Sequence, residues 1–234
     1  MTDFERIVHA RRTFESFLGS SHGKIAVLHD FDADGVTAGV ILVQALFRAG
    51  REHVSRLVVD RVRSAWSETN RRRLHDEAPD RLFVLDLGSR PDPILAGVPT
   101  CFIDHHRPAG ILPSDVLISS YDWEVIPNTS LLVWELCSTI SDVSDLDWVA
   151  AIGVLSDLGE ASPFPLLARV FEKYDRRSLK EATVLVNAVR RSAQPDPDLA
   201  VRALLAHHSP KSSCDRPARR SLACARQGRK SMRP

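Results

Sequence analysis

The chain has 234 residues, of which 44% are hydrophobic and 26% are charged, and its formal net charge is +1. This is an ordinary composition for a soluble globular protein, with enough apolar residues for one large domain or two small ones. No apolar run approaches the roughly 18 residues that a membrane span needs, and the first residues lack a signal-peptide pattern. We therefore expect a cytoplasmic protein without a membrane partner.

The distribution of charge and the spacing of the cysteines further limit which kinds of protein this chain can be. From Pro210 onward the chain has eight Lys or Arg residues and one Asp, so residues 1–209 carry a net charge of −6. An acidic body argues against a broad non-specific surface for nucleic acid, although a bound metal pair would reverse the sign locally. The four cysteines are too scattered for a disulfide framework, and we expect Cys101 and Cys137, in apolar surroundings, to be buried free thiols.

The first half of the chain alternates between helical periodicity and short, continuously apolar runs. We predict helices over 4–18, 36–47 and 70–77, and strands over 24–29, 54–60, 81–86, 99–104 and 116–118. Strands that are apolar throughout are covered on both faces, as in parallel sheets. The fold class that follows is α/β, with a mainly parallel β-sheet flanked by helices.

From Thr129 the periodicity is helical. We predict helices over 131–140, 147–155, 165–171, 179–189 and 199–205, so a helical C-terminal segment follows the sheet. After His208 the apolar periodicity is lost, and we expect the basic tail over 209–234 to be disordered.

Three carboxylates follow the first strand, in the segment His29-Asp30-Phe31-Asp32-Ala33-Asp34-Gly35. We expect this segment to be a loop at the carboxyl end of a strand, where open α/β sheets bind ligands. Three carboxylates within five residues repel one another unless a cation neutralises them, so the segment indicates a metal site. The alternative is a simple turn with a helix N-cap at Asp34-Gly35, which is about equally frequent for such a pair.

Three later segments also end on groups that bind metals. Asp86 ends one strand, Asp104-His105-His106 ends the next, and Asp157 closes an apolar helical stretch, with Glu160 nearby as a competing ligand. Taken singly, each segment has an ordinary alternative. Asp86 could begin a turn, Asp157 could cap a helix, and adjacent histidines are usually surface residues, as we expect for His207-His208. Because the carboxyl ends of neighbouring parallel strands lie side by side, the first three clusters can meet at one edge of the sheet. Four such segments in order favour a metal site.

The ligand types indicate the metal and the chemistry. Carboxylates with a few imidazoles and no thiolate suit Mn²⁺ or Mg²⁺ better than a structural zinc. Two such ions roughly 3.5–4 Å apart, bridged by one carboxylate, would clamp a phosphoryl oxygen and lower the pKa of a bridging water towards neutrality. The chemistry to expect is hydrolysis of a phosphoester or a phosphoanhydride.

The four segments together resemble the four ordered motifs of the DHH phosphoesterase superfamily, over about residues 24–160. The first segment is most similar to that of the RecJ exonuclease branch, which has an Asp-x-Asp-Ala-Asp-Gly pattern. The resemblance implies a hydrolase that typically uses Mn²⁺, with two ions, and Mg²⁺ as the alternative. Members of the superfamily act on single-stranded DNA, short RNA, phosphoadenosine phosphate, cyclic dinucleotides or pyrophosphate.

By position, the resemblance also implies roles for individual side chains. The metal ligands would be Asp30, Asp32, Asp34, Asp86, His105 and Asp157. Asp86 would bridge the two ions. His29 has three possible roles: it could replace Asp30 as the ligand of the first ion, support the site from outside the coordination sphere, or be a core residue at the strand end. His106, with help from Arg107, would contact substrate phosphate, while Asp104 would orient the histidine pair. Catalysis would then depend on Asp32, Asp34, Asp86, His105, His106 and Asp157.

Members of the superfamily usually carry a second, smaller domain with a Gly-rich, His-containing motif. Nothing after Asp157 matches that motif, since only Gly159 and Gly228 remain. We expect residues 1–160 to form the catalytic domain and residues 161–208 to be a helical extension of it or linker helices. The chain would be a stand-alone catalytic domain, one that borrows a partner, or a truncated or frame-shifted product.

Three functions are compatible with these features. The leading one is hydrolysis of phosphodiester bonds in a single-stranded oligonucleotide or a small nucleotide. The main alternative is a non-catalytic module that binds nucleotides or nucleic acid, with phosphate contacts from arginines at 71–73, 176–177 and 190–191; a pyrophosphatase is the third. Asn128-Thr129-Ser130, at a helix start, are expected to cap that helix, with donation to a phosphate as the alternative.

Overall fold

The computed structural model describes residues 1–19, 23–190, 196–206 and 209–210. The histidine pair at 207–208 and the tail from 211 onward, for which we predicted a surface position and disorder, lie outside the described residues.

Five strands form one all-parallel sheet in the order β2-β1-β3-β4-β5. They are β1 (Ile25–His29), β2 (Val54–Val58), β3 (Arg81–Leu85), β4 (Thr100–Asp104) and β5 (Val116–Ser119). The predicted α/β fold with a parallel sheet is confirmed. Every predicted strand is present, with ends that differ by one or two residues.

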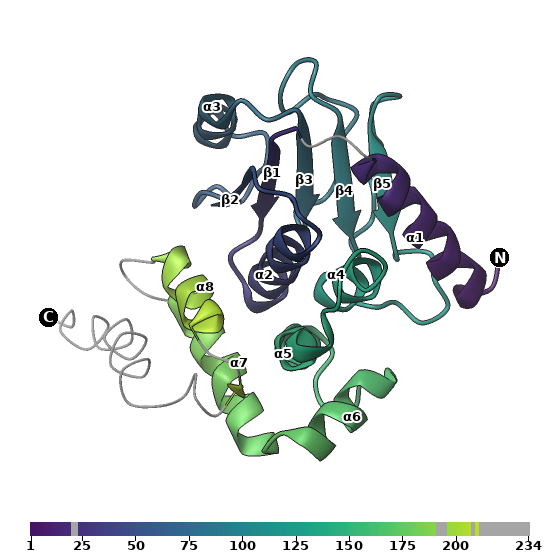
Figure 1. Ribbon diagram of the computed structural model, residues 1–234, viewed down its shortest axis with the longest axis vertical. Helices are drawn as coiled ribbons and strands as arrows, with labels where there is room; N and C mark the ends of the chain where they lie inside the picture. Colours follow the sequence, from purple (N-terminus) through teal and green to yellow (C-terminus); the bar gives the residue numbers. More distant parts are fainter. Residues whose placement is uncertain (20–22, 191–195, 207–208, 211–234) are drawn as a thin grey trace, which may run out of the picture.

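Helices cover both faces of the sheet and extend beyond it. The helices are α1 (Asp3–Leu18), α2 (Ala33–Arg48), α3 (Glu68–Glu77), α4 (Thr129–Cys137), α5 (Asp147–Asp157), α6 (Pro165–Lys173), α7 (Arg176–Arg190) and α8 (Pro197–Leu205), with a 3-10 turn at Ser144–Leu146. Figure 1 shows α2 and α4 on one face, α3 on the other, and α5 to α8 as a further layer beyond α2 and α4. The predicted helical C-terminal segment is therefore present. None of the described helices has the length and hydropathy of a membrane span.

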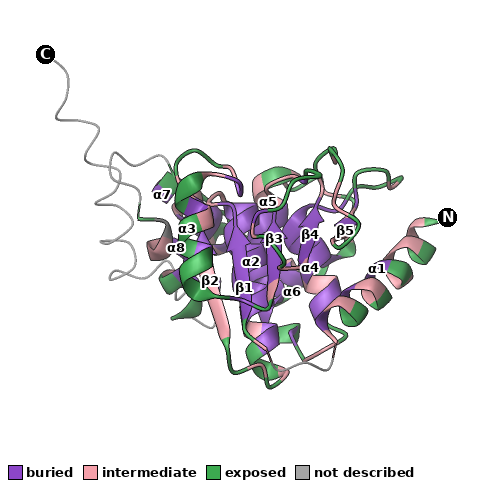
Figure 2. Ribbon diagram, turned by 90° about the horizontal axis from the view of Figure 1, so that it is seen from above, coloured by how far each residue is buried: buried purple, intermediate pink, exposed green. Residues whose placement is uncertain are grey.

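Alternate residues of each strand serve two separate cores. On β1, Ile25 and Val27 face the larger core, which includes residues of α1, α2, α4 and α5, whereas Ala26 and Leu28 face the smaller core with α3. This two-residue period follows from strand geometry, and two buried faces explain why the central strands are almost entirely apolar. The edge strand β2 includes Ser55 and Arg56 and is only partly buried. Figure 2 shows β1, β3, β4 and α2 buried, while much of α3 is exposed. Cys101 and Cys137 are buried free thiols, as predicted.

Candidate metal centre

The sheet topology places three of the predicted motifs together. The chain passes from β1 through α2 to β2 on one side, but β3 lies on the other side of β1, so the strand order reverses between β1 and β3. Ligands bind beyond the carboxyl ends of strands at such a switch point. Asp30 follows β1, Asp86 follows β3 and Asp104 ends β4. The register pairs His29 with Leu85, which puts Asp30 and Asp86 at the same level.

We expected the acidic segment after β1 to be a loop, but its second half belongs to α2. Asp32 is the N-cap of α2, and Asp34 lies in the first turn of the helix, where its side chain is buried. Asp32 accepts a hydrogen bond of 3.2 Å from the Gly35 N–H, which satisfies a donor that the first turn leaves free. A Cβ at position 35 would lie 2.7 Å from Asp30 Cβ, so glycine allows the helix to begin directly against the strand end.

The first turn of α4 holds two of the carboxylates. Asn128 Nδ2 and the Ser130 N–H each donate to Asp34 Oδ1 at 2.7 Å, and the Thr129 N–H donates to Asp34 Oδ2 at 2.9 Å. Thr129 Oγ1 donates to Asp86 Oδ1, also at 2.9 Å. Asn128 is the N-cap residue of α4, as predicted, but its side chain makes no capping hydrogen bond to the helix. The donors that we had considered for a phosphate are instead directed at Asp34 and Asp86.

His105 connects carboxylates from three further segments. Its Nε2 lies 3.3 Å from Asp86 Oδ1, 3.6 Å from Asp157 Oδ2 and 3.8 Å from Asp34 Oδ2. Asp157 is the last residue of α5, and Asp34 lies in the first turn of α2. Side chains that are far apart in the sequence therefore meet around one imidazole nitrogen.

Three overlapping groups of side chains have ligand atoms within 4.8 Å of one another. They are Asp30, Asp32 and Asp86; Asp34, His105 and Asp157; and Asp86, Asp104, His105 and His106. All six residues that we predicted as metal ligands fall in these groups. Asp86 and His105 each belong to two of them, and such sharing is what two neighbouring ions require.

Burial and mutual repulsion destabilise the charged form of these carboxylates. Burial, followed by the charge of Asp157, raises the pKa of Asp34 well above its usual value, although the N–H donors of Ser130 and Thr129 act against this. Burial, followed by the charge of Asp34, likewise raises the pKa of Asp86. Burial also raises the pKa of Asp30. Bound cations would remove this penalty, because an opposite charge nearby favours the ionised carboxylate.

The adjacent histidines are shifted in opposite directions. Burial, followed by the charge of His106, lowers the pKa of His105, whereas the hydrogen bond to Asp104 raises the pKa of His106. Asp104 Oδ1 accepts from both Nδ1 and the backbone N–H of His106, each at 2.7 Å. The lowered pKa of His105 favours the neutral imidazole that a metal needs, and the raised pKa of His106, whose side chain is 57% exposed, favours the protonated form that attracts an anion.

Two arginines pair with the first motif. Arg63, which the sequence did not single out, donates from Nε to Asp30 Oδ1 at 3.2 Å and from Nη2 to both Asp30 Oδ2 and Asp32 Oδ2. Arg190, the last residue of α7, donates from Nη1 to Asp32 Oδ2 at 3.1 Å. These guanidinium groups supply positive charge at the position where the sequence predicts a cation.

His29 lies outside the carboxylate groups. Its ring is buried against α2, where a Cβ on Gly39 would lie 2.3 Å from His29 Cδ2. His29 Nδ1 lies 2.6 Å from the Asp30 carbonyl oxygen, and Nε2 lies 3.1 Å from Arg56 Nη1. A carbonyl only accepts and a guanidinium only donates, so the imidazole is the neutral Nδ1–H tautomer. Burial, followed by the Arg56 charge, lowers the pKa of His29 to about 4.

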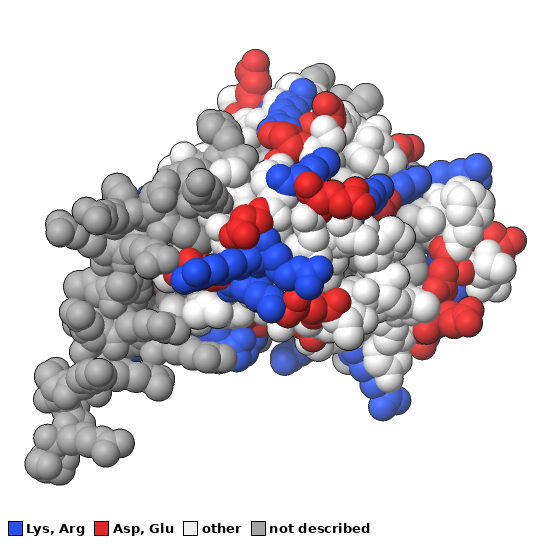
Figure 3. Space-filling model, turned by 90° about the horizontal axis from the view of Figure 1, so that it is seen from below, with Lys and Arg blue, Asp and Glu red and all other residues white. Residues whose placement is uncertain are grey.

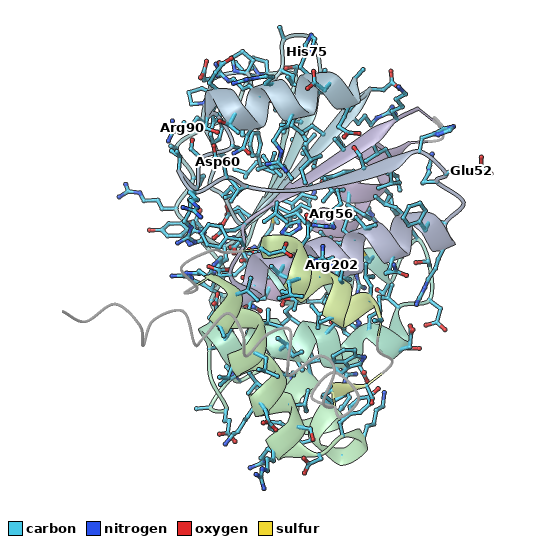
Figure 4. The ribbon with its side chains drawn as sticks, turned by 90° about the vertical axis from the view of Figure 1, so that its left-hand side faces the viewer. Glu52, Arg56, Asp60, His75, Arg90 and Arg202 are labelled. Carbon is cyan, nitrogen blue, oxygen red and sulfur yellow. The ribbon has the colours of Figure 1, made fainter. Side chains whose placement is uncertain are left out.

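The environment of Arg56 explains why this histidine faces away from the site. Arg56 Nη2 donates to Asp198 Oδ1 on α8 at 2.5 Å, and Figure 4 shows Arg56 beside α8, which carries Arg202. Of the two candidates for the first metal position, the structure therefore places Asp30 within the cluster and directs the His29 ring to the interface with α8.

Other charged candidates lie away from the cluster. Glu160 pairs with Arg176 at 3.6 Å and with Lys180, both on α7, and Arg71 pairs with Asp92 at 3.1 Å. Basic and acidic side chains are interspersed on the face shown in Figure 3. Arg107 is exposed and follows His106 directly.

Residues 24–154 match the model of the DHH family, N-terminal domain. This match spans more than half of the chain and contains the motifs around Asp34, Asp86 and His105. The chain belongs to the DHH family. No curated protein sequence matches it.

Several solved structures share the fold of this DHH-family chain. The exonuclease RecJ bound to manganese is 20% identical, with a TM-score of 0.63 over 94% of this chain and 64% of that one. RecJ from Thermus thermophilus in complex with Mn²⁺ is also 20% identical, with a TM-score of 0.67 over 97% of this chain and 38% of that one. At these identities the likeness establishes the fold. The chain spans less than two thirds of the length of either RecJ chain.

Proposed function

We propose that this DHH-family protein is a metal-dependent phosphoesterase that hydrolyses phosphodiester bonds, in single-stranded oligonucleotides or small nucleotides. The observation that carries the proposal is the position of Asp86, a buried carboxylate that belongs to two ligand groups and lies 3.3 Å from His105 Nε2. A carboxylate shared between two ligand sets suits a pair of ions that act together on a phosphoryl group. The similar RecJ structures, an exonuclease among them, support this substrate class.

The donor set fits Mn²⁺ or Mg²⁺. Carboxylate oxygens and imidazole suit these ions, and the two cysteines among the described residues lie buried outside the ligand groups. Asp32 and Asp34 would each hold a different ion, with Asp86 between them, Asp30 completing the first position, and His105 and Asp157 the second. Such ions, when bound, supply the charge that activates water and stabilises phosphoryl oxygens. The RecJ structures crystallised with Mn²⁺ and with Mg²⁺ support the same choice.

The chain's own residues position the substrate and the ligands. His106, whose pKa is raised by its hydrogen bond to Asp104, would donate from Nε2 to a non-bridging phosphate oxygen, and the exposed Arg107 lies next to it. The hydrogen bonds from the first turn of α4 stabilise the ionised form of Asp34, which the ions need. In this arrangement His105 and His106 have separate tasks although they are adjacent in sequence.

A substrate panel with one matched pair of variants tests the proposal. The full chain is incubated with Mn²⁺ and bis-p-nitrophenyl phosphate, single-stranded DNA, short RNA, phosphoadenosine phosphate, cyclic dinucleotides and pyrophosphate. We expect Mn²⁺-dependent diester hydrolysis that Asp86→Asn lowers by ~100-fold or more, while Asp122→Asn, at an exposed aspartate, leaves it unchanged.

Two outcomes would overturn the proposal. Tight nucleotide binding without turnover of any substrate would indicate a non-catalytic module. Turnover confined to pyrophosphate would indicate a pyrophosphatase instead of a diesterase.

A further inference from the structure

Asn187, on α7, contacts two other segments through a single side-chain amide. Its Oδ1 accepts the Ala33 N–H at 3.1 Å, and its Nδ2 donates to Ser156 Oγ at 2.9 Å. Ala33 is the first residue of α2, and Ser156 lies in the last turn of α5. The amide therefore joins the N-terminus of one helix to the C-terminus of another.

Both contacts fall beside proposed metal ligands. Ala33 lies between Asp32 and Asp34, and Ser156 directly precedes Asp157. These helix ends carry like charges, and the charge of Asp157 is among the causes that raise the pKa of Asp34. Repulsion between carboxylates favours moving the two helix ends apart, and a hydrogen-bonded link between them opposes that movement.

We infer that Asn187 is a positioning residue of the metal centre, which sets the separation between the start of α2 and the end of α5 through its bonds to Ala33 and Ser156. This inference rests on the proposed two-ion function and deepens it. Asn187 acts through the segments that carry Asp34 and Asp157 and is not itself a ligand.

The chemistry of the two contacts requires an amide. A backbone N–H can only donate, so the group facing Ala33 must be an acceptor, and the group facing Ser156 Oγ is then the NH₂ donor. An aspartate at position 187 would keep the acceptor and lose the donor. It would also add a negative charge beside several carboxylates that already repel one another. A leucine has a similar size and supplies neither bond.

The remainder of α7 supports this role. Val186 and Val189, on either side of Asn187, are buried in the larger core, and α7 packs against α5 and α2. Arg190, three residues after Asn187, pairs with Asp32. Residues at positions i and i+3 share a helix face, so one face of α7 carries both contacts to the first motif.

Calorimetric titration of Mn²⁺ into the metal-free full chain tests the inference. Asn187→Leu should weaken Mn²⁺ binding by ~10-fold or more, as is typical when a partner of the ligands is lost. Ser156→Ala, which removes one of the two bonds, should weaken it by roughly twofold to tenfold. The double variant should be no weaker than Asn187→Leu, because Ser156 acts through the same amide. Val184→Ala, at an exposed position of the same helix, should bind Mn²⁺ as the wild type does.

An electron paramagnetic resonance spectrum of the Mn²⁺-loaded protein provides a readout that a general loss of stability would not move. The magnetic coupling between two Mn²⁺ ions depends on their separation and bridging. We expect a coupled spectrum for the wild type and for Val184→Ala, and a weakened or uncoupled one for Asn187→Leu.

The outcomes separate this inference from the proposed function. Wild-type affinity and coupling in both Asn187→Leu and Ser156→Ala would overturn the role of Asn187 and leave the two-ion function standing. A wild type that binds no Mn²⁺ would overturn both. If Asn187→Leu fails to fold, the Mn²⁺ affinity of Ser156→Ala tests the inference by itself. This variant should fold, because it loses only one hydroxyl from a half-buried position. Unchanged Mn²⁺ binding in Ser156→Ala would then overturn the inference.

Discussion

The Thr129 N–H donates a hydrogen bond of 2.9 Å to Asp34 Oδ2, between residues that are 95 positions apart in the sequence. The first turn of a helix has free N–H groups and a partial positive charge. Here that turn belongs to α4, and it stabilises the ionised form of a carboxylate at the start of α2, against the effect of burial. The first motif therefore depends on α4 as well as on its own residues.

Replacing Asn128 tests this dependence. Asn128→Leu keeps the size of the buried side chain but removes the Nδ2 donor to Asp34 Oδ1. We expect a loss of Mn²⁺ affinity of ~10-fold or more and a lower melting temperature, measured by calorimetry. Ser138→Ala, at the exposed opposite end of α4, is the control and should match the wild type. Equal Mn²⁺ affinity in Asn128→Leu and wild type would contradict a role for α4.

Arg63 should oppose metal binding, because its guanidinium pairs with Asp30 and Asp32 where the first ion is proposed to lie. Arg63→Gln removes both the positive charge and the ion pair that an ion has to displace. We expect Mn²⁺ to bind about tenfold more tightly, equivalent to ~1.4 kcal/mol, and the metal-free protein to unfold at a lower temperature, since Asp30 is left buried and unpaired.

Arg61→Gln provides the matched control, because Arg61 is exposed and precedes Arg63 by two residues in the same loop. Its Mn²⁺ affinity should be that of the wild type. Weaker Mn²⁺ binding in Arg63→Gln would show that the arginine assists the ion instead of competing with it.

Mn²⁺ affinity should rise with pH. Burial raises the pKa of both Asp34 and Asp86, so these carboxyls hold protons in the metal-free protein at a higher pH than free aspartate does. An ion has to displace those protons, and raising the pH removes the competition. Titrations at several pH values from roughly 5 to 8, in buffers of different ionisation enthalpy, should show proton release on binding. A constant affinity without proton release would refute this expectation.

His29 should make the fold less stable as the pH falls. Its pKa is about 4 in the folded protein and 6.5 in the unfolded chain, so between these values the unfolded chain binds more protons. The stabilisation is complete above pH 6.5 and is lost as the pH falls towards 4. A shift of this size corresponds to about 3 kcal/mol in the free energy of unfolding.

The comparison protein is His29→Gln, whose amide retains a donor and an acceptor but does not titrate. The raised pKa values of Asp34 and Asp86 change the stability in the opposite direction as the pH falls, but both residues are present in both proteins. The difference in unfolding free energy between the two proteins therefore reports the contribution of His29 alone. Parallel stability profiles from pH 6.5 to 4 would mean that the His29 pKa is not lowered.

The parallel sheet, and the meeting of the motifs at one edge of it, could be predicted from the local sequence. The three central strands, β1, β3 and β4, are mostly apolar because both of their faces are buried, and Asp30, Asp86 and Asp104 each follow or end one of them. The edge strand β2, with Ser55 and Arg56, is only partly buried. Parallel strands bring their carboxyl ends to one edge whatever the intervening residues are. The helix predicted from residue 36 begins three residues earlier, at Ala33, because Asp32 is its cap and the buried Asp34 belongs to its first turn.

The sequence by itself determined which residues are candidates for the centre, because strand ends, turns and ligand types are properties of short segments. Only the tertiary structure decided how those residues are held. Asn187 and Arg63 have no local pattern that marks them, and the place of Asn128 at a helix start predicted a cap and not a contact with the first motif. Each of the three contacts a motif residue from a different element. The direction of the His29 ring was likewise decided by Arg56 on β2 and by α8, since a hydrogen bond between distant segments depends on how the chain packs and not on the neighbours of either residue.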